Sequence, residues 1–268
     1  MNNFLKENKI GIFIITRYNS KRLRQKASIK ISNQINLTEL LIERMKHYFN
    51  NFDITICTSK TNNNMNFYKK IGTKYEVDVF FGPEKNMIKR VIDCMEKKNL
   101  KHFVRVTGDN PMTDPLAILN LAKNHIKNKN EYTYTDSLPH GMKPEIFSLA
   151  GLKKNIKKIV NLNSTEYLTY FFHRPDLYKI QKINIIKNFK NQNFLSITVD
   201  YKKDILLLKN LIRKYKTLFI NRNQVINFLK KYSKILVKKK QKILLKTKDY
   251  NAKYKFDSDD KFIIINKR

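Results

Sequence analysis

The chain has 268 residues and a formal net charge of +33, with 55 Lys and Arg against 22 Asp and Glu. Its length fits one large domain, or one domain with an appendage. Its apolar runs, such as residues 12–15 and 262–265, are too short to span a bilayer, and the first run reaches Arg17 too early to be a signal-peptide core. These features predict a cytoplasmic protein without a membrane span.

The excess of cations has two interpretations. It could mark a nucleic-acid-binding protein, but the cations are spread over the whole chain and are not gathered in one arm. Lys, Ile and Asn are abundant together, as expected for a chain encoded by an AT-rich genome. We find no RNA-binding motif and no aromatic residues interleaved with cations. Nucleic acid is therefore not expected as a partner.

The first half alternates between strand-like and helix-like segments. Short β-rich runs are followed by segments whose apolar residues recur at helical spacing. Strands are expected at residues 10–16, 54–58, 77–81 and 103–107, and helices at residues 37–49, 66–71, 86–98 and 115–126. This alternation predicts an α/β fold, Rossmann-like, with a mostly parallel twisted sheet and helices on both faces.

The second half is less regular. Strands are expected at residues 132–135, 145–149, 178–186 and 195–199, and helices at residues 150–159, 164–172, 202–215 and 223–232. From residue 233 the chain is Lys-rich and poorly patterned. We expect there either a short helix with a β-like end at residues 262–265, or loosely ordered chain. The predicted division is a main domain over residues 1–232 and an appendage over residues 233–268.

The two cysteines, Cys57 and Cys94, each lie in an apolar pattern, one on a predicted strand and one on a predicted helix. We expect two reduced thiols in the core, with a disulfide or a catalytic thiol as the alternative. The five histidines show no spacing typical of metal ligands.

Five cations follow the first predicted strand within ten residues. This cationic loop, residues 17–26, has the sequence RYNSKRLRQK. Loops at the carboxyl end of a parallel strand are where open α/β sheets bind ligands, and Arg and Lys side chains suit a triphosphate. The loop is not a Walker motif, because G-x-x-x-x-G-K-[ST] is absent. In so basic a chain, a solvated basic face is the alternative.

Two aspartates come directly after predicted strands. Asp109 follows a glycine and would lie at the carboxyl edge of the sheet, where a carboxylate can meet Mg²⁺ and phosphate oxygens. Asp200 follows residues 195–199 and precedes a predicted helix. A turn or helix N-cap is the alternative for both, and Asp114 fits that role well because Pro115 comes next.

Together these segments resemble cytidylyltransferases that activate acidic sugars, a family that includes acylneuraminate and 3-deoxy-manno-octulosonate cytidylyltransferases and SpsF-like spore coat polysaccharide biosynthesis proteins. The cationic loop is similar to the family's R-x-x-S-x-R-L-P-G-K. Residues 104–115 (VRVTGDNPMTDP) resemble V-R-I-T-G-D-C-P-L-I-D-P. Further segments match in family order: residues 80–84 (FFGPE) with Arg90, residues 141–148 (GMKPEIFS), residues 165–175 and residues 198–200 (TVD).

The resemblance implies a CTP-using nucleotidyltransferase, with Mg²⁺ as cofactor, that transfers CMP to an acidic sugar for surface polysaccharide biosynthesis and releases pyrophosphate. Residues 1–232 would be its nucleotidyltransferase domain. The resemblance implies that Arg22 and Lys26 hold the triphosphate and that Asp109 and Asp200 are the metal ligands. Arg22, Lys26 and Asp109 are the catalytic candidates. The further nucleotide-binding candidates are Arg17, Ser20, Thr58, Ser59 and Arg90, and the sugar-binding candidates are Gly141, Glu145 and Glu166.

The sequence also departs from the family pattern. Arg24 and Gln25 replace Pro-Gly, Lys143-Pro144 replaces Asp-Val, and Tyr167 replaces His. The altered loop leaves a catalytically degenerate member as one alternative. A nucleotide-sugar-dependent glycosyltransferase is another, although no D-x-D motif follows a comparable strand. The expected partners are CTP and an acidic sugar. The chain could also form a homodimer.

Overall fold

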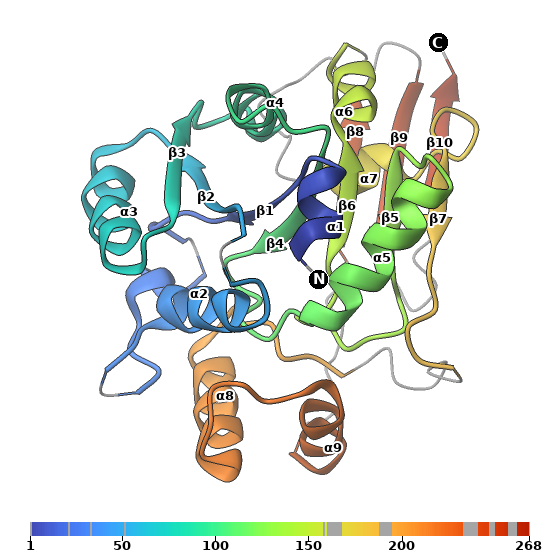
Figure 1. The fold of residues 1–268 in the computed structure, drawn as a ribbon. Helices are drawn as coiled ribbons and strands as arrows, with labels where there is room; N and C mark the ends of the chain where they lie inside the picture. Colours follow the sequence, from blue (N-terminus) through green and yellow to red (C-terminus); the bar gives the residue numbers. More distant parts are fainter. Residues whose placement is uncertain are drawn as a thin grey trace.

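The computed structural model describes residues 2–20, 22–32, 34–50, 52–157, 159, 168–187, 195–232, 241–246, 250–256 and 262–267. Within them, one seven-stranded sheet has the order β3-β2-β1-β4-β6-β5-β7 (Figure 1). Its strands are β1 (Ile10–Ile15), β2 (Ile54–Ser59), β3 (Asp78–Gly82), β4 (His102–Thr107), β5 (Tyr132–Tyr134), β6 (Glu145–Ser148) and β7 (Ile180–Lys182). Only β6 runs antiparallel to its two neighbours. The predicted Rossmann-like, mostly parallel sheet is confirmed.

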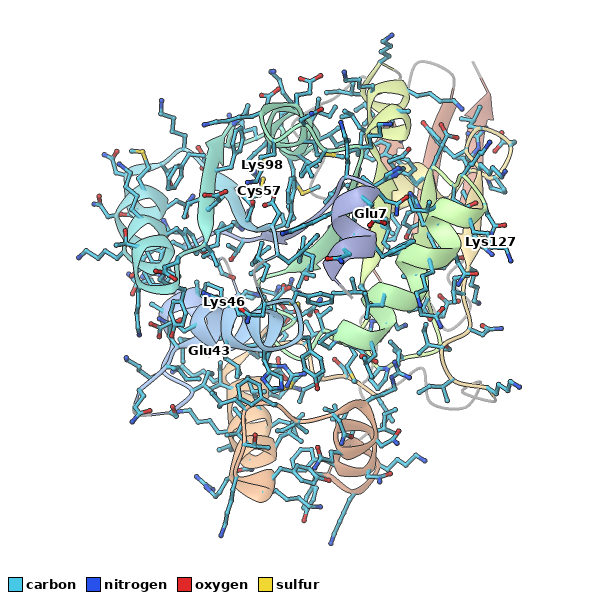
Figure 2. All side chains as sticks on the ribbon, viewed as in Figure 1. Glu7, Glu43, Lys46, Cys57, Lys98 and Lys127 are labelled. Atoms are coloured by element: carbon cyan, nitrogen blue, oxygen red, sulfur yellow. The ribbon has the colours of Figure 1, made fainter. Side chains whose placement is uncertain are left out.

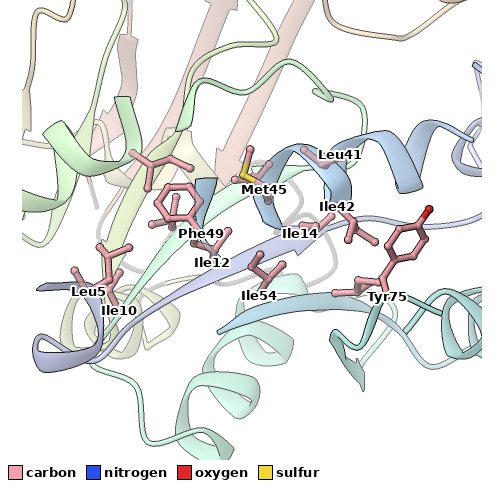
Figure 3. Close-up of a cluster of buried hydrophobic side chains, with 14 of the residues drawn as sticks. Leu5, Ile10, Ile12, Ile14, Leu41, Ile42, Met45, Phe49, Ile54 and Tyr75 are labelled. Atoms are coloured by element: carbon pink, nitrogen blue, oxygen red, sulfur yellow. The ribbon is translucent and has the colours of Figure 1, made fainter. Parts of the chain in front are cut away.

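Helices cover both faces of this sheet. One face packs against α1 (Asn2–Glu7), α2 (Leu37–Tyr48), α3 (Asn62–Tyr75) and α5 (Pro115–Lys127). The other face packs against α4 (Met87–Lys97), α6 (Leu149–Ile156) and α7 (Leu168–Phe172). Figure 3 shows part of the first core, where Met45 and Phe49 at the end of α2 pack over Ile12 of β1.

Local sequence explains where the main helices begin. The Asn36 side chain accepts a hydrogen bond from the Glu39 amide and the Glu39 carboxylate accepts one from the Asn36 amide, which forms a capping box for α2. Asp114 caps α5 and Pro115 occupies its first turn. The predicted capping role of Asp114 is therefore confirmed.

Two more helices, α8 (Lys202–Tyr215) and α9 (Arg222–Tyr232), lie beyond the carboxyl edge of the sheet (Figure 1). A third core cluster joins them to this edge. The buried guanidinium of Arg44 on α2 donates to the carbonyls of Leu218 and Ile220, at 2.6 and 3.1 Å. Arg222 pairs with the Asp114 carboxylate at the start of α5. These contacts fix the helix pair against α2 and α5.

The structure differs from the predictions mainly in the second half. Residues 195–199 form no regular strand, and only an isolated bridge joins Ser196 to His140. The strand expected at residues 178–186 is reduced to β7. Alternating apolar residues are also compatible with extended chain that packs without a full ladder, which explains both differences. The helix α1 was not predicted, and α3 is longer than expected because Thr61 caps it upstream.

The C-terminal part contains a separate antiparallel sheet. It consists of β8 (Gln241–Lys246), β9 (Tyr250–Phe256) and β10 (Phe262–Lys267), in the order β10-β9-β8. The expected β-like end at residues 262–265 lies in β10, and no helix occurs in the described residues after Tyr232. The boundary at residue 233 stays a prediction.

Charge and cysteines follow the expectations. Figure 2 shows Lys46 on α2 and Lys127 at the end of α5 on separate parts of the molecule, in agreement with dispersed cations. Both cysteines are buried and free, with Cys57 on β2. Within the described ranges, no helix is long and apolar enough to cross a membrane.

Candidate active site

The segments that follow β1 and β4 meet at one edge of the sheet, because these strands are parallel neighbours. Ile15 pairs with Thr107 at the strand ends, and the Gly108 amide donates to the Ile15 carbonyl at 2.9 Å. A Cβ at Gly108 would come within 2.3 Å of the Thr16 hydroxyl oxygen. Glycine permits this close approach and places Asp109 beside the start of the cationic loop.

The segment that carries Asp200 lies against the same edge. The Val199 amide donates to the Asp109 carbonyl at 2.9 Å. Gly141 contacts this segment from the other side: its φ is +87°, and a Cβ there would lie 2.6 Å from the Thr198 amide nitrogen. Gly141 therefore has a clear backbone role in placing this segment, and its predicted contact with a sugar stays a prediction.

Lys26 connects the two aspartates. Its Nζ lies 3.1 Å from Oδ2 of Asp109 and 3.3 Å from Oδ1 of Asp200, and it donates to the Val199 carbonyl at 2.9 Å. Nη1 of Arg22 lies 2.9 Å from Oδ2 of Asp200. Arg22, Lys26, Asp109 and Asp200 thus form one ion cluster, and the structure brings together four residues that sequence analysis selected.

The ion cluster is partly shielded from solvent. The side chains of Lys26, Asp200 and Asp109 are 13%, 22% and 27% exposed, and that of Arg22 is 51% exposed. Burial by itself would raise the pKa of Asp109, but the Lys26 ammonium and a hydrogen bond from Thr107 outweigh it and hold the pKa below its ordinary value. Asp109 is therefore an anion at neutral pH, as a cation ligand must be.

The two carboxylates fit a shared divalent cation. Both lie within 3.3 Å of one ammonium nitrogen, so one positive centre already bridges them. Mg²⁺ commonly takes one or two protein carboxylates and completes its shell with phosphate oxygens and water. Asp109 and Asp200 supply carboxylate oxygens, and these oxygens lie close enough together to bind one cation.

The tip of the cationic loop faces solvent. Leu23 is 8% exposed and belongs to the third core cluster, whereas Arg22 and Arg24 are exposed and Ser20 is half-buried. Gln25 has a φ of 51°, in the left-handed region, at the position where the resembled motif has Gly. An open groove of about 800 Å³ adjoins the tip, and its lining includes the cations Arg22, Arg24, Lys202 and Lys203.

Other predicted nucleotide contacts lie at the neighbouring end of β2. Thr58 is fully buried, and its hydroxyl has no hydrogen-bond partner within the described residues. Ser59 is buried beside the start of α3. Arg90 on α4 donates to a backbone carbonyl of the preceding loop at 2.8 Å; burial lowers the pKa of its guanidinium, and the nearby charge of Arg17 lowers it further.

The predicted sugar-binding half contains a buried ion pair. Glu145 on β6 pairs with Arg105 of β4, directly across the antiparallel register. The Tyr132 and Thr169 hydroxyls donate to the other carboxylate oxygen, at 2.6 and 2.8 Å. Burial would raise the pKa of Glu145, but Arg105 and these hydroxyls lower it below the ordinary value. Glu166 lies outside the described residues.

The sequence matches a protein-family model described as cytidylyltransferase over residues 12–253. The chain belongs to the cytidylyltransferase family. The matched range contains every member of the ion cluster and most of the seven-stranded sheet.

Individual proteins are similar to this chain over most of its length. The spore coat polysaccharide biosynthesis protein SpsF of Bacillus subtilis is 26% identical over 213 residues, 77% of this chain and 88% of the relative. A cytidylyltransferase structure from Leptospira borgpetersenii serovar Hardjo-bovis has a TM-score of 0.75 at 24% identity, covering 87% of this chain and 98% of that one. A CMP:2-keto-3-deoxy-manno-octonic acid synthetase complexed with CTP has a TM-score of 0.58 at 11% identity, covering 77% and 99%. The two structures show a shared fold.

Arg105 was not predicted as a site residue, although it lies inside the motif at residues 104–115. An Arg within a β-rich run is compatible with a strand that exposes one face, and its partner Glu145 lies 40 residues away. The available signal was a charged residue within an otherwise buried central strand.

Proposed function

We propose that the protein transfers CMP from CTP to an acidic sugar, releases pyrophosphate and uses Mg²⁺. The observation that carries this proposal is the ion cluster, in which two cations of the loop after β1 meet two carboxylates at the carboxyl edge of the sheet. Family membership supports a cytidylyl donor. The similarity to the spore coat polysaccharide biosynthesis protein SpsF supports a role in polysaccharide biosynthesis, and the fold shared with the CMP:2-keto-3-deoxy-manno-octonic acid synthetase supports an acidic sugar. The cytoplasm, where CTP is made, is the proposed location.

In this mechanism the residues of the ion cluster divide between phosphate and metal. Arg22 and Lys26 bind the triphosphate and stabilise the charge that develops on the leaving pyrophosphate. Asp109 and Asp200 would hold Mg²⁺, which when bound neutralises phosphate charge and orients the reacting groups. The sugar hydroxyl oxygen attacks the α-phosphorus in line, the bond from that phosphorus to the bridging oxygen of pyrophosphate breaks, and the hydroxyl proton passes to water.

The neighbouring elements are assigned to the two substrates. The end of β2, with Thr58 and Ser59, would lie near the cytosine base, and Arg17 and Arg90 would add positive charge beside it. The sugar would bind towards β6, near Gly141 and Glu145. Because Glu145 is already bonded to Arg105, its role in this proposal is to hold that arginine in place as well as to face the sugar.

Product analysis tests the proposed function. The protein is incubated with CTP, Mg²⁺ and a panel of acidic sugars, and mass spectrometry is used to search for a CMP-sugar together with pyrophosphate. Parallel reactions with ATP, GTP and UTP test the base. A protein that binds CTP and forms no product with any sugar of a broad panel would support the catalytically degenerate alternative.

Matched substitutions test the residues. Asp109→Asn and Asp200→Asn preserve shape and remove the ligand charge, so turnover should fall by orders of magnitude in a folded protein. Asp93→Asn, on the surface of α4 where Asp93 pairs with Lys89, is the control and should leave turnover unchanged. Near-normal turnover in either of the first two variants would contradict the assignment of the metal ligands.

A further inference from the structure

The helix α3 directs two buried polar side chains towards the cationic loop. Asn64 and Tyr68 are four residues apart, and therefore on one face of the helix, and they are 3% and 0% exposed. Polar groups buried this fully are normally hydrogen-bonded, so their partners show which segments the two side chains connect.

Asn64 joins the loop to the end of β2. Its Oδ1 accepts a hydrogen bond from the Tyr18 amide at 2.8 Å. Its Nδ2 donates to the Ser59 carbonyl at 2.9 Å and to the Ser59 hydroxyl at 2.6 Å. Tyr18 is the second residue of the cationic loop, and its ring also packs against Phe67 of α3 at 4.9 Å between centroids. The first residues of the loop are thus fixed relative to β2.

Tyr68 and Thr38 hold the two ends of the loop. The Tyr68 hydroxyl lies 2.9 Å from the hydroxyl of Thr16, the residue directly before the loop. The Thr38 hydroxyl donates at 3.0 Å to the carbonyl of Ala27, the residue directly after Lys26. Buried hydroxyl groups therefore hold the chain both directly before the loop and directly after it.

We propose that Asn64 and Tyr68 are positioning residues that hold the cationic loop in the shape in which Arg22 and Lys26 bind one triphosphate together. The inference rests on the proposed function, because it takes CTP as the ligand. Neither residue belongs to the ion cluster, so each acts through the loop. A loop that is ordered before binding loses less conformational freedom when the ligand arrives, and so binds more tightly with the same contacts.

Two small substitutions test this role. Tyr68→Phe removes only the hydroxyl, and Asn64→Ala removes all three hydrogen bonds of the side chain. Calorimetry with CTP and Mg²⁺ should show roughly tenfold weaker binding for each, the scale of one or two lost net hydrogen bonds, although every cation is retained. Hydrogen exchange should become faster for residues 16–28, most of all at the Tyr18 amide.

The same helix supplies the controls. Tyr75→Phe removes a hydroxyl at the other end of α3, and Asn63→Ala removes an exposed amide beside Asn64. Both should bind CTP within about twofold of the wild type, because Tyr75 is buried at the end of α3 that is opposite to Asn64 and Asn63 is exposed to solvent. Arg22→Ala is the reference for a lost contact: it should weaken CTP binding without faster exchange of the loop.

These outcomes test the positioning role and the proposed function separately. If Tyr68→Phe and Asn64→Ala melt at lower temperature but bind CTP as the wild type does, both residues are merely structural and the inference is overturned. If the wild type does not bind CTP, the proposed function fails. Hydrogen exchange then still decides the positioning role, which is overturned if the protection of residues 16–28 is unchanged in both variants.

Discussion

Lys26→Met removes the positive charge from between Asp109 and Asp200 and keeps most of the side-chain volume. The nearer oxygens of the two carboxylates lie 3.1 and 3.3 Å from Nζ of Lys26. If their charges are taken as about 5 Å apart, at an effective dielectric constant of about 20, they repel each other by about 3 kcal/mol. The variant also loses charge-assisted hydrogen bonds, each worth about 1.5–3 kcal/mol. Local relaxation returns part of this loss. We therefore expect the free energy of unfolding to fall by about 2–4 kcal/mol at pH 7.

The pH dependence of this loss has a defined sign. In the folded chain the pKa of Asp109 lies below its ordinary value of 3.8. The stability that comes from this shift is therefore present above pH 3.8 and is lost as the pH falls through the lower folded-state pKa. The difference in stability between wild type and Lys26→Met should be largest at pH 7 and should shrink as the pH falls, because without Lys26 burial raises the pKa of Asp109 and its repelling charge is neutralised at a higher pH.

Urea unfolding followed by circular dichroism, at pH 7, 5 and 4, measures these differences. Adding Mg²⁺ should stabilise Lys26→Met more than the wild type, because in the wild type the ammonium competes for the same carboxylates. Lys89→Met, which breaks an exposed ion pair on α4, is the control and should change stability little. A variant as stable as the wild type at pH 7, or a difference that persists undiminished at the lowest pH, would refute the reasoning.

Three further predictions concern single residues. Gln25→Gly should raise the free energy of unfolding by up to about 1 kcal/mol, because glycine adopts the left-handed φ without steric cost; urea titration at pH 7 measures it. Burial lowers the pKa of His102 to about 4 and that of His125 to about 3. The free energy of unfolding should therefore fall as the pH drops below about 6.5, where the unfolded chain takes up protons that the folded chain does not. Melting curves at several pH values should show a smaller loss of stability with falling pH for His125→Asn. Gly141→Ala should cost more than about 1 kcal/mol and displace Thr198, measured by urea titration and by hydrogen exchange of residues 195–200.

The part of the site on the central strands could be predicted from the sequence. Asp109 and the cationic loop both follow strongly β-rich runs, and the carboxyl ends of parallel strands share an edge. The meeting of Lys26 with Asp109 follows from that rule once β1 and β4 are neighbours. The order of the strands could not be read from residue patterns and is seen only in the structure.

The rest depends on contacts that leave little local signal. Asp200 was expected after a regular strand, but its segment is extended chain held by Gly141 and by the Asp109 carbonyl. The pair of Arg105 and Glu145 requires an antiparallel register that no local pattern specifies. Asn64 lies in a polar run, NNN, where nothing marks the third asparagine as buried. In each case tertiary packing decides the role of the residue.

The ion cluster joins residues that are far apart along the chain: Lys26 lies 83 residues before Asp109 and 174 residues before Asp200. A ribosome makes the chain from its N-terminus, so the loop cations leave the exit tunnel long before either carboxylate partner does. The contact to Asp200 closes one of the longest loops in the domain, and such contacts form slowly. The newly made chain can therefore complete the ion cluster only at a late stage of its folding, and on the proposed function its affinity for CTP would appear only then.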